Sequence, residues 1–145
     1  FIHPSIHSFI YFLVSYLFFL DLPVMTYHVQ SGYDLYLARC KDTTCLGKDI
    51  VLLDAVGTVG AFNSLGLAPD GSPIVSYYTG DALKLCFCHD PKCATTTKRL
   101  VDSGNTGSST SLALHPTTHF PVIAYTALSP DKHLRLAACA DPTCF

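Results

Sequence analysis

The amino-acid sequence predicts an all-β protein built from a repeated four-stranded antiparallel unit of about 48 residues. Three observations support this. Related segments recur at one common spacing, Gly and Pro interrupt the chain at short intervals, and no stretch sustains the i, i+3, i+4 apolar spacing of a helix. Hydrophobic residues make up 49% and charged residues 14% of the 145 residues, which excludes a disordered polyampholyte.

The repeat is visible at four separate landmarks. A Pro-apolar-x-x-Tyr segment occurs three times, as PVMTYH at 23–28, PIVSYY at 73–78 and PVIAYT at 121–126. Pairs of cysteines recur at offsets of 48 and 51, as Cys40 and Cys45, Cys88 and Cys93, and Cys139 and Cys144. Asp54 recurs as Asp102, and NSLGL at 63–67 recurs as TSLAL at 110–114. Four landmarks with one period are hard to produce by chance.

One period contains four short strands in order. The segment beginning at Asn63 leads through Pro69-Asp70-Gly71, a hairpin signal with Asp-Gly at the turn, into the strand at 73–78. The third strand, at 82–88, alternates so that Leu83, Leu85 and Phe87 share one face. The turn HDPK then leads to the fourth strand, TTTKRLVD at 95–102.

Four antiparallel strands in about 48 residues is the size of a β-propeller blade. A β-helix needs shorter rungs, and an immunoglobulin-like sandwich does not repeat at half its own length. Propellers close with about four to eight blades, whereas residues 23–145 supply about two to three. We therefore expect an incomplete ring, either a fragment or a unit that assembles with copies of itself. The start at Phe1 and the end at Phe145, directly after a cysteine pair, favour a fragment.

The order of these motifs resembles a repeat of large secreted bacterial propeller-type proteins, most of them uncharacterised. The motifs that carry it are SLGLAPDGSPIVSYY at 64–78, LKLCFCHDPKC at 83–93 and the Thr-rich strand that ends in Val-Asp at 101–102. The resemblance covers residues 23–145. It implies a β-propeller in an extracytoplasmic setting and implies no particular activity.

Residues 1–22 form a hydrophobic lead. The run FIYFLVSYLFFL at 9–20 has the length of a signal-peptide core and is too short for a comfortable membrane span. However, the first 20 residues contain no Lys or Arg, and no small-residue cleavage site follows. The interpretations left open are a damaged secretion signal, mistranslated flanking sequence, or a degenerate blade strand in which SYLFFLDLP at 15–23 replaces SLGLAPDGSP.

Each cysteine pair brackets the turn between the third and fourth strands. A four-residue hairpin loop holds its flanking Cα atoms about 4.5–5.5 Å apart, within the range of a disulfide. We expect three bridges, each contributing about 2 kcal/mol in the chain-entropy model: Cys40–Cys45, Cys88–Cys93 and Cys139–Cys144. A structural zinc site needs four ligands, which cysteine pairs on separate hairpins do not readily supply. Reduced structural thiols are a further alternative. Disulfides indicate an oxidising compartment, and so an extracytoplasmic or secreted protein.

The remaining cysteine, Cys86, aligns with Ala38 and Ala137, which predicts a small buried site rather than a reactive thiol. His115 and His119 flank a hairpin tip, where solvated turn residues are more common than a shared metal. We predict no metal, cofactor or catalytic residue in this chain. Its acidic residues are all Asp; Asp42, Asp90 and Asp141 recur in the cysteine turns and Asp54 recurs as Asp102, as structural turn residues do.

Tyr27, Tyr77 and Tyr125 match one another along the repeat. They predict packing between blades, with a stacking surface for sugars as the functional alternative. Strand parity places the cysteine turns and the Asp-Gly hairpin at one end of the blades. The more variable loops at 79–82, 103–109 and 127–133 then lie at the other end, where we expect a binding site.

These observations together favour a non-enzymatic binding or scaffold module with a carbohydrate or protein ligand. The alternative is a fragment of a propeller-fold glycoside hydrolase or lyase whose catalytic residues lie outside this chain. The formal net charge of −2 offers no basic field for a nucleic acid. Remaining blades of a parent chain, or copies of this one, are the expected structural partners.

Overall fold

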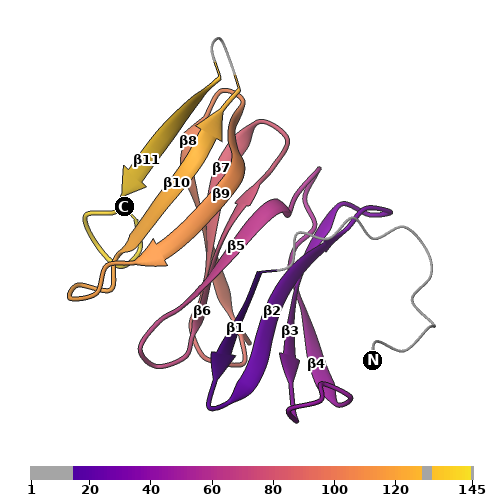
Figure 1. Cartoon of the computed structure of the whole chain (residues 1–145). Helices are drawn as coiled ribbons and strands as arrows, with labels where there is room; N and C mark the ends of the chain where they lie inside the picture. Colours follow the sequence, from indigo (N-terminus) through magenta and orange to yellow (C-terminus); the bar gives the residue numbers. More distant parts are fainter. Residues whose placement is uncertain (1–14, 129–131, 145) are drawn as a thin grey trace.

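The computed structural model describes residues 15–128 and 132–144. These residues form three antiparallel sheets and no helix, which confirms the all-β prediction. The first sheet contains β1 (Ser15–Phe19), β2 (Leu22–Val29), β3 (Asp34–Cys40) and β4 (Lys48–Asp54). The second contains β5 (Ala61–Leu67), β6 (Pro73–Tyr78), β7 (Ala82–Cys88) and β8 (Thr96–Ser103). The third contains β9 (Thr106–Leu114), β10 (Pro121–Ala127) and β11 (His133–Ala138), and strands pair in chain order throughout (Figure 1).

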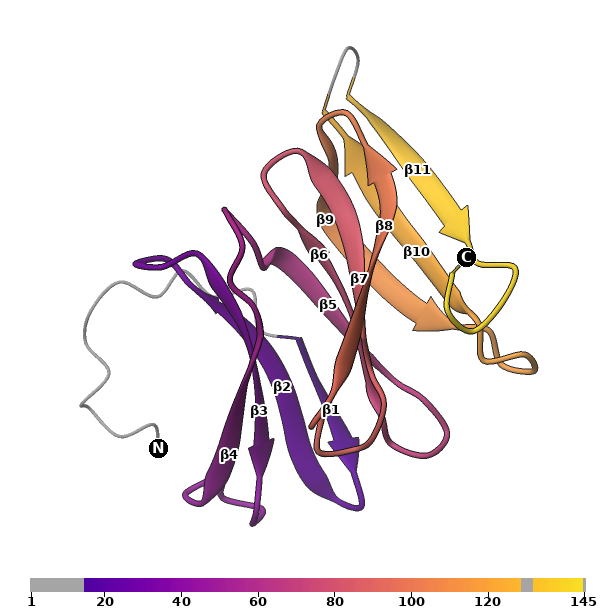
Figure 2. The ribbon, with the colours of Figure 1, turned by 180° about the vertical axis from the view of Figure 1, so that it is seen from behind.

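The second sheet lies between the other two, so both of its faces are buried (Figure 2). On β6 and β7, Val75, Tyr77 and Cys86 pack against the first sheet. On β7, the third sheet packs against the alternate residues Leu83, Leu85 and Phe87. These three residues share one face of the strand, as the sequence predicts. The chain therefore forms two successive inter-sheet contacts, one on each side of the second sheet.

Ser15 to Phe19, within the hydrophobic lead, form the strand β1. Phe19 pairs with Leu22 across a two-residue turn, where Leu20 and Asp21 have φ values of 51° and 62°. Two positive φ angles are the signature of a type I′ hairpin, whose twist matches that of the strands. Residues 1–14, which contain the rest of the signal-like run, lie outside the described residues.

The first strands of the second and third sheets begin earlier than the landmarks at 63 and 110 predict. Each starts with a β-bulge in which a residue other than glycine has a positive φ, 50° at Phe62 and 52° at Ser109. Glycine precedes each bulge by two residues. A Cβ atom at Gly107 would lie 2.7 Å from the Leu83 Cα, so the bulge lets the backbones of β9 and β7 approach closely.

Candidate functional site

All three predicted disulfides are present in the structure. They are Cys40–Cys45, Cys88–Cys93 and Cys139–Cys144, with Cα–Cα distances of 4.7, 4.7 and 4.6 Å. The second cysteine of each pair has a positive φ of 56° or 57°, so the three turns have one conformation. Cys86 is a free, fully buried thiol, and burial raises its pKa to about 11. Its side chain packs in the apolar core, as the predicted small buried site does.

The aspartates in the cysteine turns are structural residues. In each turn the carboxylate accepts a hydrogen bond from the backbone N–H two residues later: Asp42 from Thr44 at 2.9 Å, Asp90 from Lys92 at 2.7 Å and Asp141 from Thr143 at 2.7 Å. The Thr44 hydroxyl and the Gly47 N–H also donate to Asp42. These bonds, led by that of the Thr44 hydroxyl, lower the Asp42 pKa to about 2.

The two aspartates that end fourth strands do more than form turns. The hydroxyl of Tyr77 donates to the Asp54 Oδ2 at 2.7 Å, and that of Tyr125 donates to the Asp102 Oδ2 at 2.7 Å. In both cases a tyrosine in the second strand of one sheet reaches the aspartate at the end of the preceding sheet. We call these the Tyr–Asp ties. Sequence reasoning missed them, although the separation of 23 residues is the same in both pairs.

The two Tyr–Asp ties differ in their surroundings. Asp54 is 3% exposed, and its nearest cation is the Lys98 ammonium at 3.6 Å. Asp102 is more exposed and accepts a second short bond, from the Arg135 Nη1 at 2.7 Å. Burial raises the Asp102 pKa, but the bonds from Tyr125 and Arg135 outweigh it and hold that pKa below its usual value. Burial and the bond to Asp102 raise the Tyr125 pKa to about 12.

A second set of polar contacts joins the same sheets in the opposite direction. The Thr26 hydroxyl of β2 donates to the Asn63 Oδ1 of β5 at 2.7 Å. One repeat later, the Ser76 hydroxyl of β6 donates to the Thr110 hydroxyl of β9 at 3.0 Å. We call these the hydroxyl ties. Each inter-sheet contact therefore contains one tie of each kind, and these fixed polar contacts add to the apolar packing between the sheets.

The repeated tyrosines do not form a common surface for sugars. Tyr77 is 0% and Tyr125 5% exposed, so both are packing residues within the inter-sheet contacts. Tyr27 differs because no described sheet precedes its own. It lies on the outer face of the first sheet and stacks on Tyr36, with ring centroids 5.5 Å apart and an interplanar angle of 17°.

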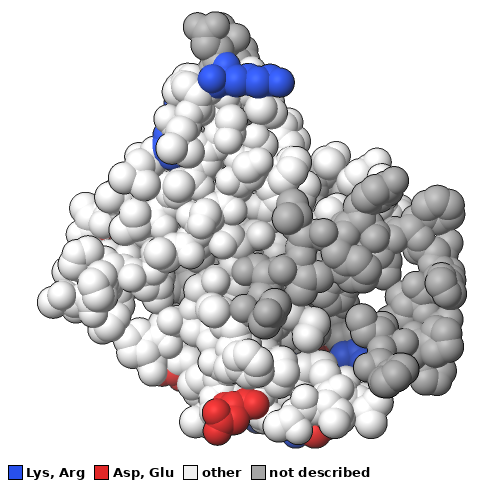
Figure 3. Space-filling view, in the orientation of Figure 1, with Lys and Arg blue, Asp and Glu red and all other residues white. Residues whose placement is uncertain are grey.

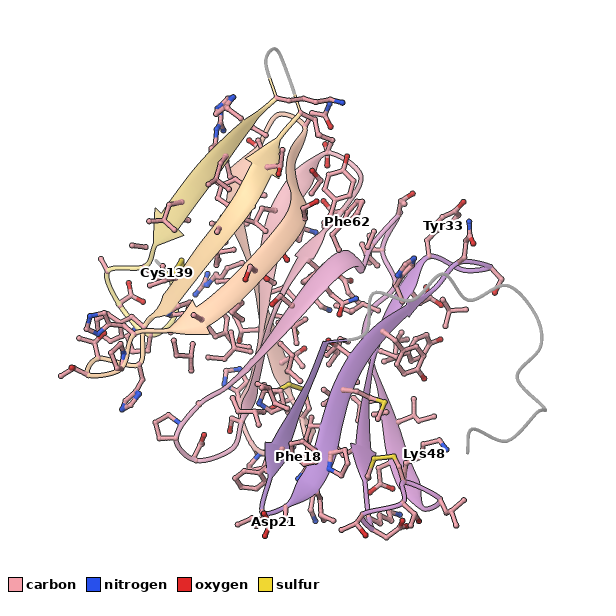
Figure 4. All side chains as sticks on the ribbon, viewed as in Figure 1. Phe18, Asp21, Tyr33, Lys48, Phe62 and Cys139 are labelled. Atoms are coloured by element: carbon pink, nitrogen blue, oxygen red, sulfur yellow. A yellow bond between two sulfur atoms is a disulfide. The ribbon has the colours of Figure 1, made fainter. Side chains whose placement is uncertain are left out.

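A groove of about 520 Å³ lies between the second and third sheets. It opens at the end that carries the cysteine turns, near the residue labelled Cys139 in Figure 4. Its apolar part contains Pro69, Ile74 and Phe87. Its polar part contains groups from both sheets: Asp70, Ser72, His89, Thr97, Arg99, Thr118, His119 and Thr143.

Several polar groups of the groove are held in place by local bonds. Asp70 accepts hydrogen bonds from the Ser72 N–H at 3.0 Å and the Ser72 hydroxyl at 2.9 Å, which lower its pKa. The His89 Nε2 is 2.7 Å from the Thr97 hydroxyl oxygen. The groove therefore presents one guanidinium and two imidazoles beside a single carboxylate whose oxygens already accept two bonds.

The groove does not lie where the sequence predicts a binding site. It is at the end of the cysteine turns, opposite the loops at 79–82 and 103–109. Residues 129–131 of the third loop lie outside the described residues. The groove is built from turns that belong to different sheets, and no single stretch of sequence contains enough of it to be recognised.

The two hairpin histidines lie in different environments. The His115 Nδ1 accepts hydrogen bonds from the backbone N–H groups of Thr117 and Thr118 at 3.3 and 3.2 Å, so its ring serves the turn. His119 lines the groove instead. Among the described residues no three His, Cys, Asp or Glu side chains are grouped as a metal site would require.

In the view of Figure 3, most of the surface is uncharged; basic residues lie near the upper tip and at the lower right, and acidic residues lie along the lower rim. The part of the chain that the structure describes contains no helix with the length and apolarity needed to cross a membrane. Comparisons with protein-family models, curated proteins and solved structures find no match to this chain.

Proposed function

We propose that the chain is part of an extracytoplasmic β-propeller-type protein, in which it serves as a non-enzymatic binding or scaffold module. Three features support the proposal. Successive sheets of one repeat, two with four strands and one with three, stack in chain order. Their first strands lie next to one another, and each repeat contains a bridge suited to an oxidising compartment. The recurring aspartates and tyrosines are occupied in turns and ties, as in a structural repeat.

We propose that the groove binds an acidic carbohydrate, and its composition is the observation that carries this proposal. Arg99, His89 and His119 favour an anionic group, since the single carboxylate of Asp70 is already bonded to Ser72. The threonine hydroxyls suit a ligand with many hydroxyl groups of its own. Ile74 and Phe87 offer an apolar floor for the C–H face of a sugar ring.

A glycan array with the oxidised chain tests this proposal, followed by calorimetry with a galacturonic acid trimer and a neutral galactose trimer. We expect binding of the acidic trimer only. Arg99→Gln should weaken it about tenfold or more, as loss of a charge-assisted hydrogen bond does. Lys48→Gln is the matched control, because it removes one positive charge at the end of the first sheet, far from the groove (Figure 4).

Each other outcome contradicts part of the proposal. Equal binding of both trimers would show that charge is not what the groove recognises. Binding of acidic peptides in place of glycans would replace the ligand class. Binding to neither would leave only the scaffold role, and release of reducing ends from glycans would favour the hydrolase or lyase alternative.

A further inference from the structure

The outer face of the third sheet exposes residues whose repeat equivalents are buried elsewhere in the chain. Leu134 and Leu136 of β11 are 77% and 69% exposed. At the repeat offset of 51 residues their equivalents are Leu83 and Leu85, which are 0% exposed because the third sheet covers them. The corresponding leucines of β3 are equally buried beneath the second sheet.

The outer face of the first sheet is the other half of the same contact. Tyr27 on this face is the repeat equivalent of Tyr77 and Tyr125, each of which packs against the sheet before it. Tyr27 is only partly buried, whereas Tyr77 and Tyr125 are 0% and 5% exposed. The chain thus carries both surfaces of a contact that it already makes twice internally.

We propose that a second copy of this chain docks head-to-tail, with the outer face of its first sheet on the outer face of the third sheet. The occupant is a second copy because the two outer faces correspond, through the repeat, to faces that already pack against each other inside the chain. The internal contacts show how such faces pack. This interface joins two different surfaces, so a dimer still has one free surface of each kind. Further copies can therefore add to form open chains or closed rings. The inference rests on the repeat and is independent of the groove.

The proposed contact should be weaker than the internal ones. Ala124 occupies the position of Thr26 and Ser76, so it has no hydroxyl to form a hydroxyl tie. The apolar packing remains and this tie is lost. We therefore expect association that depends on concentration, with a Kd on the order of micromolar.

Sedimentation velocity at about 1 to 100 µM tests the proposal. Leu136→Asp disables the outer face of the third sheet, and Tyr27→Asp that of the first. Each variant alone should be monomeric, and an equimolar mixture should form a heterodimer and nothing larger, because only one intact face of each kind remains. Val56→Asp, at an exposed position in the loop after β4, is the matched control and should associate like the wild type.

Circular dichroism of each variant confirms that it is folded, and Leu134→Asp provides a second, independent change on the third sheet. A wild type that stays monomeric at the highest concentration overturns the proposal. So does an equimolar mixture that stays monomeric, or a Tyr27→Asp variant that associates as well as the wild type. The last result would mean that the third sheet pairs with itself. None of these results depends on whether the groove binds a sugar.

Discussion

Removal of one hydroxyl group, in Tyr77→Phe, tests whether the Tyr–Asp ties stabilise the stack of sheets. The ring of Tyr77 is fully buried and its hydroxyl lies 2.7 Å from the Asp54 Oδ2. Phenylalanine keeps the ring, so no cavity forms and the change removes only the hydrogen bond. The carboxylate of Asp54 then keeps the Ala55 N–H at 3.0 Å and the more distant Lys98 ammonium at 3.6 Å.

The expected cost follows from the burial of the acceptor. A hydrogen bond to a charged group contributes about 1.5–3 kcal/mol net, and a buried acceptor left without its donor lies at the upper end of this range. We expect Tyr77→Phe to lower the free energy of unfolding by about 2–3 kcal/mol. Since 1 kcal/mol shifts the Tm of a domain of this size by about 2–4 °C, the Tm should fall by about 4–12 °C.

Two further variants make the comparison quantitative. In Tyr125→Phe, Asp102 keeps its short bond to Arg135 and is more exposed, so we expect a smaller loss of about 1 kcal/mol. Tyr33→Phe changes an exposed side chain and should cost less than about 0.5 kcal/mol. Urea unfolding without reductant, followed by circular dichroism, measures all three. A Tyr77→Phe variant within about 0.5 kcal/mol of the wild type, or one less affected than Tyr125→Phe, would refute the argument.

Three other predictions follow from the bridges, the bulges and the cysteine turns. Without reductant, iodoacetamide should label one thiol, Cys86, and only after unfolding, because the other six cysteines are bridged; mass spectrometry that finds seven labelled thiols contradicts this. Gly107→Ala should lower the free energy of unfolding in urea by about 3 kcal/mol or more. Gly104 has a similar positive φ, but a Cβ atom there would have nothing within 4 Å, so Gly104→Ala should cost about 1–2 kcal/mol. Equal losses would show that the close approach of Leu83 is not the cause. The folded-state pKa of Asp42 is lowered from 3.8 to about 2. Its contribution to the free energy of unfolding is therefore fully present above about pH 4 and is lost as pH falls towards 2. Asp42→Asn should flatten this part of a plot of urea midpoint against pH, and an unchanged slope would contradict the assignment.

The second, third and fourth strands and the bridges were predictable because local signals determine them. An Asp-Gly turn and a proline precede the second strand, and a cysteine turn separates the third strand from the fourth. Residues that flank a short hairpin loop must face each other. The bulge at Phe62 was not predictable, since a positive φ at phenylalanine runs against its propensity and is imposed by packing of the first strand against its neighbours. The glycines two residues before the bulges, Gly60 and Gly107, are the only local sign of it.

The Tyr–Asp ties needed pairwise reasoning. Asp54 alone has the properties of a turn residue, and Tyr77 alone those of a packing residue. Only their shared separation, repeated in Asp102 and Tyr125, indicates that they meet. The groove lies further from prediction, because its surface combines turns from two sheets whose spacing depends on how the sheets stack.

The pattern of ties has a consequence for motion within the native state. Each tie connects a sheet only to the next one along the chain, so the array behaves as a linear series in which stability depends on neighbours. The second sheet is held from both sides, whereas the first and third are each held from one side by described residues. Amide hydrogens of β6 and β7 should therefore exchange with solvent most slowly, and those of β4 and β11 should exchange first, through local opening at the two ends of the array.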